Sequence, residues 1–133
     1  AQITKGSQLV AQGARFIGTN PDLSIPAEEG DIPGCGSICA LIEAATGRQP
    51  YFLGKPNPFM MRSALDKLGV TASNAVMVGD RIDTDVLSGM ELGLQTVLVL
   101  TGASRRESID AFPYNPGLIL PRLLDLREHM GLV

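Results

Sequence analysis

Three aspartates within six residues form the densest group of chemically reactive side chains in this sequence. They lie in VMVGDRIDTDV, residues 76–86, where an apolar run ends in Gly79-Asp80 and is followed by Asp83 and Asp85. Carboxylates this close repel one another unless a cation or solvent lies between them. Hard oxygen ligands of this kind suit Mg²⁺, which usually keeps several waters and takes few protein carboxylates. The segment therefore predicts a magnesium site that includes Asp80.

The same cluster has a second interpretation, because acidic residues also favour the first turn of a helix. For Asp83 the sequence favours this solvated helix start. Asp80 is different, since it directly follows the apolar run, and ligand sites in open α/β sheets lie at the carboxyl ends of strands. Gly79 lets the backbone turn there without a side chain in the way.

A second chemical feature is the segment GKPNP, residues 54–58. Lys55 follows a short apolar stretch and lies between a glycine and a proline. Its ammonium could neutralise a phosphoryl group together with a neighbouring carboxylate. Taken alone, the segment fits an exposed loop lysine better, so the role of Lys55 depends on the wider pattern.

Alternating helix-like and strand-like segments must position these side chains. Apolar spacing predicts helices over 3–12, 36–46, 57–68 and 85–92, with a last helix opened by Pro121. It predicts strands at 14–19, 51–53, 75–78, 96–100 and 118–120. This alternation predicts an α/β fold with a parallel sheet. Two local patterns predict helix caps, one at Thr84 and one formed by Ser104 with Glu107.

Composition and charge exclude several classes of protein. The 133 residues suffice for one domain, or one domain and part of another, and the net charge is -3 with scattered basic residues. Nucleic-acid binding is therefore not expected. Neither a transmembrane run nor a signal peptide is recognisable, so the chain is predicted to be cytoplasmic without a membrane partner. Cys35 and Cys39 fit small core residues in a reducing compartment.

Together, GKPxP and the later apolar strand ending in GDRxxTD resemble the late motifs of the haloacid dehalogenase superfamily. ARFIGTNPD at 14–22, PGCGSICALIEAATGRQP at 33–50 and TVLVLTG at 96–102 extend the resemblance over nearly the whole chain. They are similar to the branch that holds nitrophenylphosphatase, pyridoxal phosphatase and ribonucleotide monophosphatase-like enzymes. The resemblance implies an incomplete Rossmann-like core, a parallel sheet with flanking helices, over residues 50–133. Residues 1–49 would be the C-terminal part of an α/β cap domain.

The resemblance also implies roles for the residues of the core. The lysine that matches Lys55 stabilises the nucleophile and the phosphoryl charge, and the aspartate that matches Asp80 binds Mg²⁺. The aspartate that matches Asp85 supports the metal or its waters, and Thr84 caps the helix beside it.

For the cap, the resemblance implies that residues 20–31 form the substrate-selecting loop. Asn20 and Asp22 are the candidate substrate-binding residues there. The implied partner is a small phosphorylated metabolite, and a homodimer formed through the cap is a further implied state.

One departure from the family pattern is large. The family's first motif, DxDG or DxDxT, carries the nucleophile and the general acid/base, and the present sequence contains no such motif. We therefore expect the missing N-terminal half, or a second chain, to supply it, and we expect this chain to be inactive alone. The strand at 75–78 would then be an open sheet edge, so the chain is not expected to be a self-sufficient fold.

The implied activity is Mg²⁺-dependent hydrolysis of phosphomonoesters through an aspartyl-phosphate intermediate. The alternative is a non-catalytic half-domain that binds magnesium, phosphate or a partner protein. A phosphoacceptor receiver domain fits less well, because its acidic pair should end the first strand and Gly79-Asp80 ends a late one.

Overall fold

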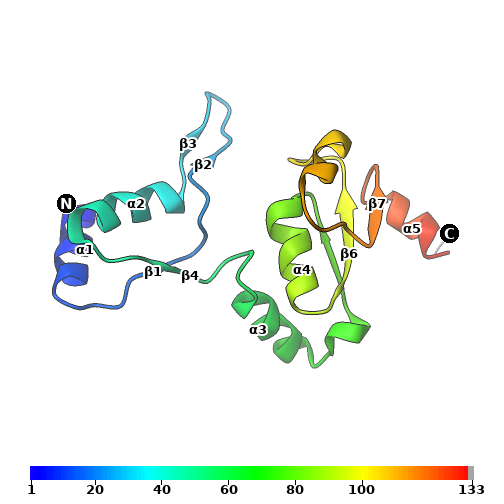
Figure 1. Cartoon of the computed structure of the whole chain (residues 1–133), viewed down its shortest axis with the longest axis horizontal. Helices are drawn as coiled ribbons and strands as arrows, with labels where there is room; N and C mark the ends of the chain where they lie inside the picture. The colour runs from blue at the N-terminus through cyan, green and yellow to red at the C-terminus, as the bar shows by residue number, and fades with distance from the viewer. Residues whose placement is uncertain (132–133) are drawn as a thin grey trace. The chain divides into compact units, whose positions relative to one another are not determined.

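The computed structural model describes residues 1–131, and the chain divides into two compact units (Figure 1). The first unit runs from Ala1 to Gly54, and the second begins at Lys55. The sequence analysis placed the boundary earlier, after residue 49. The assignment of the two units to a cap and a core stays a prediction.

The first unit contains two packed helices, one short parallel strand pair and one hairpin. Helix α1 packs on α2, β1 pairs in parallel with β4, and β2 pairs in antiparallel with β3. The segment between residues 20 and 34, predicted as a loop, contains this hairpin. The elements are α1 (Gln2–Ala11), β1 (Ile17–Gly18), β2 (Ser24–Ile25), β3 (Ile32–Pro33), α2 (Cys35–Thr46) and β4 (Tyr51–Phe52).

The second unit is a three-stranded parallel sheet with flanking helices, in the strand order β5-β6-β7. Its strands are β5 (Val76–Gly79), β6 (Gln95–Val99) and β7 (Leu118–Leu120). Its α-helices are α3 (Phe59–Leu68), α4 (Leu87–Glu91) and α5 (Asp125–His129). Short 3₁₀ turns span Ala72–Asn74 and Arg106–Ala111, and a π-helical turn spans Ile82–Val86.

Strand β6 is the centre of this sheet, as its continuous apolar sequence predicted. Leu98 is fully buried in a cluster with Ile82 and Val86, while Val97 and Val99 belong to a second cluster with Leu120. A strand buried on both faces needs apolar residues at every position. The core therefore fixes the ends of β5 and β6, from which the polar side chains of the site project.

Strand β5 is an edge of the sheet, because among residues 1–131 it pairs only with β6. Val76 at its start is 51% exposed. Helix α3 has no buried residue, and its Leu68 is 72% exposed. Unpaired strand edges and exposed apolar faces are surfaces that folded proteins usually cover. Within residues 1–131, no helix is long and apolar enough to cross a membrane.

The two predicted helix caps were wrong. Thr84 lies inside the π-helical turn and is buried, so it does not start a helix. The turn over Arg106–Ala111 is capped through Arg105 and Ser108, and Ser104 instead accepts a hydrogen bond from the Ile82 N–H. Both predictions followed local sequence rules, whereas Ser104 contacts the segment after β5 and Thr84 lies in a turn closed on the Arg81 carbonyl.

Candidate functional site

The acidic segment leaves the sheet at the carboxyl end of β5. The strand ends at Gly79, and the chain then turns into the π-helical turn over Ile82–Val86, where the Arg81 carbonyl accepts hydrogen bonds from the N–H groups of Asp85 and Val86. Single π-helical turns are rare and often lie at functional sites. The turn brings the Asp85 side chain back to the backbone of Asp80 and Arg81.

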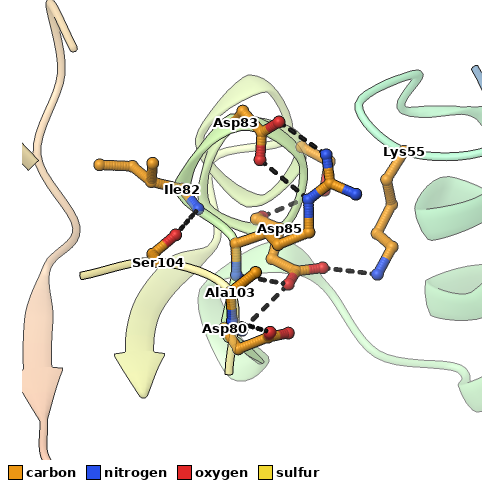
Figure 2. Close-up of polar contacts among 9 residues, drawn as sticks. Lys55, Asp80, Ile82, Asp83, Asp85, Ala103 and Ser104 are labelled. Atoms are coloured by element: carbon orange, nitrogen blue, oxygen red, sulfur yellow. Dashed lines mark hydrogen bonds and ion pairs between the residues drawn. The ribbon is translucent and has the colours of Figure 1, made fainter. Parts of the chain in front are cut away.

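Asp85 is the buried centre of the polar network in Figure 2. One carboxylate oxygen lies 2.5 Å from the Lys55 ammonium, and the other accepts hydrogen bonds from the backbone N–H groups of Asp80 and Arg81, both at 3.1 Å. The side chain of Asp85 is 5% exposed, whereas that of Lys55 is 42% exposed. A buried carboxylate must be paired and hydrogen-bonded. The Lys55 ammonium and the two amides meet that need.

The loop that follows the neighbouring strand β6 fixes Asp80 through two hydrogen bonds. Its carboxylate accepts a hydrogen bond of 2.8 Å from the Ala103 N–H, and its carbonyl accepts one of 3.0 Å from the Ser104 N–H. A Cβ on Gly102 would overlap the Asp80 carboxylate, so a glycine is needed there. The loop after β6 thus fixes both the backbone and the side chain of Asp80.

Gly79 makes room for a second carboxylate. A Cβ at this position would overlap the side chain of Asp85. The sequence predicted that Gly79 lets the backbone turn without obstruction. In the structure, the Asp85 side chain occupies the space that a side chain at position 79 would need. Gly79 therefore leaves room for the Asp85 carboxylate, and Gly102 leaves room for the Asp80 carboxylate.

Asp83 takes no part in this network and pairs with Arg81 instead. The guanidinium of Arg81 lies 2.7 Å from one Asp83 carboxylate oxygen and donates a second bond of 3.1 Å to the other. These hydrogen bonds hold the pKa of Asp83 below its ordinary value, against an opposing effect of partial burial. The two side chains remain 36% and 47% exposed. The sequence favoured a solvated helix start for Asp83, and the structure adds a pairing with Arg81 that the sequence did not predict.

The donor set fits a magnesium site to which this chain contributes one carboxylate. Asp80 presents hard oxygen to the end of the sheet, whereas both oxygens of Asp85 are engaged with Lys55 and with backbone amides. Among residues 1–131, no three His, Cys, Asp or Glu side chains are grouped to hold a metal. Mg²⁺ usually takes one or two carboxylates besides water and substrate. The geometry therefore suits Asp85 to a supporting role.

The two predicted substrate residues, Asn20 and Asp22, lie in the first unit. The Asn20 carboxamide oxygen accepts a hydrogen bond of 3.1 Å from the Asp22 N–H, and the Asp22 carbonyl accepts one of 2.8 Å from Gly36. The loop is thereby fixed against the start of α2. The structure thus brings Asn20 and Asp22 together in one unit, and Lys55, Gly79, Asp80, Thr84 and Asp85 together in the other.

Three residues of the site escaped the sequence analysis, namely Gly102, Ala103 and Ser104. The only sequence signal was their place directly after the central strand, in TVLVLTGAS. Parallel neighbouring strands end at the same edge of a sheet. The chain after β6 therefore meets the chain after β5.

Comparisons with known proteins show which family the chain resembles. A family model described as HAD-hydrolase-like matches residues 52–126, which is more than half of the chain. Dihydroxyacetone phosphatase from Corynebacterium glutamicum (strain R) is 50% identical over 126 residues, covering 95% of this chain and 46% of that protein. Ribonucleotide monophosphatase NagD from Escherichia coli (strain K12) is 43% identical over 122 residues, covering 92% and 48%.

Solved structures agree as well. The p-nitrophenyl phosphatase from Archaeoglobus fulgidus superposes with a TM-score of 0.86 at 42% identity, over 96% of this chain and 51% of that one. The predicted fold class, α/β with parallel strands and flanking helices, is confirmed. The chain spans about half the length of the relatives it matches.

Proposed function

This chain belongs to the family of haloacid dehalogenase-like hydrolases, and on that premise we propose that it carries part of the active site of a Mg²⁺-dependent phosphomonoester phosphatase. The observation that carries the proposal is the convergence of Lys55, Asp80 and Asp85 at the carboxyl end of β5. Ligands bind at this end of open α/β sheets. A cation and an anchored carboxylate are among the groups that phosphoryl transfer uses.

In this proposal Lys55 stabilises the negative charge that spreads over the phosphoryl oxygens. Its side chain is 42% exposed, so it can contact a ligand while Asp85 holds its ammonium from the buried side. Asp85 thus acts through Lys55 and through the amides of the loop. Asp80 supplies a metal ligand, and Mg²⁺ at that carboxylate would neutralise phosphoryl charge and orient the ester.

The nucleophile of the proposed reaction is an aspartate that the first family motif would supply. No such motif occurs among the 133 residues. The phosphoryl group would pass to that aspartate and then to water. This chain is therefore expected to be active only with the missing portion, from its own parent or from a second chain.

The proposed substrate is a small phosphorylated metabolite. Two relatives are a dihydroxyacetone phosphatase and a ribonucleotide monophosphatase, which act on small phosphorylated compounds according to their names. In the proposal, the loop with Asn20 and Asp22 selects among such esters. Its backbone is fixed on α2 through Gly36, so its side chains are presented from a defined position.

A hybrid protein tests the function directly. In this hybrid, the present chain replaces the matching region of the C. glutamicum relative, so that the rest of the relative supplies the nucleophile. We expect the hybrid to hydrolyse p-nitrophenyl phosphate with Mg²⁺ and to lose the activity on chelation. Asp80→Asn and Lys55→Met should each lower kcat/KM by about 10²-fold or more, as loss of a charge-stabilising group does.

The matched control is Asp83→Asn, which changes a carboxylate three residues from Asp80 that pairs only outside the network. This variant should keep kcat/KM within about threefold, since it lies outside the proposed machinery. A folded hybrid that keeps its activity after Asp80→Asn would overturn the proposal. A folded hybrid that binds Mg²⁺ and phosphate without turnover would favour the non-catalytic alternative.

A further inference from the structure

The two cysteines of the chain lie side by side in the first turn of α2. Their sulfur atoms are 3.9 Å apart, and both are free thiols. Cys35 opens the helix and is partly exposed, whereas Cys39 is 5% exposed. The sequence analysis interpreted both as small core residues, and this holds only for Cys39. One thiol is therefore open to solvent and the other is buried directly beneath it.

The surroundings of Cys35 favour its thiolate form. Hydrogen bonds from the Asn20 backbone and the Thr19 hydroxyl lower the pKa of Cys35 to about 7, with smaller effects from the Thr19 backbone and from Cys39. Burial raises the pKa of Cys39 to about 11, and the neighbouring Cys35 adds to this. Cys39 thus keeps its proton and can donate its S–H to the Cys35 sulfur. Thiolates, not thiols, are the reactive species.

Tight backbone packing fixes Cys35 in this position. The N–H groups of the two flanking glycines, Gly34 and Gly36, donate hydrogen bonds of 2.8 Å to the carbonyls of Leu23 and Asp22. A Cβ on either glycine would overlap backbone atoms of residues 21–23. The backbone on either side of Cys35 is therefore held against residues 21–23.

We propose that Cys35 and Cys39 form a peroxide-responsive thiol pair, in which Cys35 is oxidised first and Cys39 closes an intramolecular disulfide. The Cys35 sulfur attacks a hydroperoxide, so that an S–O bond forms, the O–O bond breaks, and the peroxide is reduced to hydroxide or alkoxide. Cys39 then attacks the Cys35 sulfenic acid. The S–S bond forms, the S–O bond breaks, and the hydroxyl leaves as water with the proton of Cys39.

Helix geometry permits this bond. Residues four apart are separated by about 6 Å along a helix axis, and disulfide-bonded residues have Cα atoms about 4.4–6.8 Å apart. Because Cys35 is the first helical residue, its conformation can change without breaking helical hydrogen bonds further along. Closing the bond would turn the Cys35 sulfur away from Thr19 and Asn20. Oxidation would therefore release a contact that holds the loop, independently of the proposed phosphatase function.

The first test is chemical labelling of the reduced hybrid protein, with peptide mapping to follow Cys35 and Cys39, because the lone chain is not expected to fold by itself. Iodoacetamide at neutral pH should label Cys35 on the order of 100-fold faster than Cys39, since the larger thiolate fraction outweighs the lower nucleophilicity of a low-pKa thiol. In urea the two rates should become nearly equal. Equal labelling in the native protein, or preferential labelling of Cys39, would overturn the proposal.

The second test is oxidation of the same hybrid protein by hydrogen peroxide, with peptide mapping by mass spectrometry. The unmodified chain should form the Cys35–Cys39 disulfide, which dithiothreitol should reverse. Cys39→Ser should accumulate a sulfenic acid on Cys35 that dimedone traps, whereas Cys35→Ser should react little. A Cys39→Ser variant without a dimedone adduct, or disulfides formed only between chains, would contradict the proposal.

Discussion

The Lys55 ammonium contacts the buried carboxylate of Asp85 at 2.5 Å across thirty residues of sequence. The pair is unequal, because Asp85 is almost fully buried and Lys55 is open to solvent on one side. Its two partners are therefore not equivalent, and their removal should have different consequences.

A double-mutant cycle in the hybrid protein tests this asymmetry. Lys55→Met leaves the Asp85 carboxylate buried with only two amide donors. We expect it to lower the free energy of unfolding by about 2 kcal/mol, which is less than the roughly 3–5 kcal/mol typical of fully buried pairs. Asp85→Asn keeps an acceptor for those amides and leaves a solvated ammonium, so we expect it to lower the free energy of unfolding by only about 1 kcal/mol. The double variant should lose less than the sum, measured by urea denaturation. Strict additivity would show that the pair is not coupled.

An exposed ion pair on the same unit is the control for this cycle. Arg122 and Asp125 pair at 2.7 Å three residues apart, and the Arg122 side chain is 65% exposed. Exposed pairs of this kind contribute little. Replacing Arg122 should leave the free energy of unfolding nearly unchanged. Asp125 is kept in the control, because its carboxylate also accepts a hydrogen bond from the Arg122 N–H.

Gly79 should tolerate no side chain. Gly79→Ala places a Cβ where the Asp85 carboxylate lies, so the loop must shift. We expect the hybrid to lose most of its activity together with several degrees of Tm, because overpacking costs about 1–3 kcal/mol. The comparison is Gly6→Ala in α1, whose Cβ would meet only Ile42 at 3.9 Å. That change should stabilise the helix by about 0.5–1 kcal/mol. Equal changes in Tm for Gly79→Ala and Gly6→Ala would refute the conclusion that Asp85 needs the space beside Gly79.

The Asp83–Arg81 pair should contribute to stability only above acid pH. The pKa of Asp83 is depressed from 3.8 by hydrogen bonds from Arg81. A depressed carboxylate stabilises the folded state above its unfolded pKa, and this stabilisation is lost as the pH falls through the folded pKa. We expect Asp83→Asn to flatten the fall in Tm below pH 3.8 and to change activity little. If Tm fell equally with pH in Asp83→Asn and in the unmodified protein, the pair would not contribute to stability.

The lone chain should associate in solution. Strand β5 ends the sheet with Val76 half exposed, and α3 exposes Phe59, Met60 and Leu68. Open strand edges and exposed apolar faces favour association. Light scattering coupled to size exclusion should show species larger than a monomer, and the hybrid protein should form fewer of them. A stable monomer with one sharp thermal transition would contradict this prediction.

Much of the fold followed from local patterns in the sequence. Continuous apolar residues identified β6, and the left-handed glycines Gly47 and Gly69 end α2 and α3 where helical periodicity stops. Lys55, Asp80 and Asp85 were grouped by their motifs, and the structure brings them together. These features depend on residues close in sequence or on a repeated spacing.

The features that sequence reasoning missed depend on contacts between separate segments. Ser104 satisfies a simple capping rule, yet its hydroxyl accepts from Ile82, 22 residues earlier. Thr84 also fits a cap, but the turn around it widens into a π-helix that returns Asp85 to the amides of residues 80 and 81. The low pKa of Cys35 likewise comes from Asn20 and Thr19. Neither the spacing nor the composition of the sequence contains these relationships.

The loop after β6 has one more consequence for Asp80. Because Ala103 and Ser104 already fix its carboxylate and its carbonyl, this side chain is ordered before any cation arrives. Freezing a mobile side chain on binding commonly costs about 0.5–1.5 kcal/mol. Here that entropy is lost when the sheet forms, so a cation that bound Asp80, as proposed, would not have to order this side chain again.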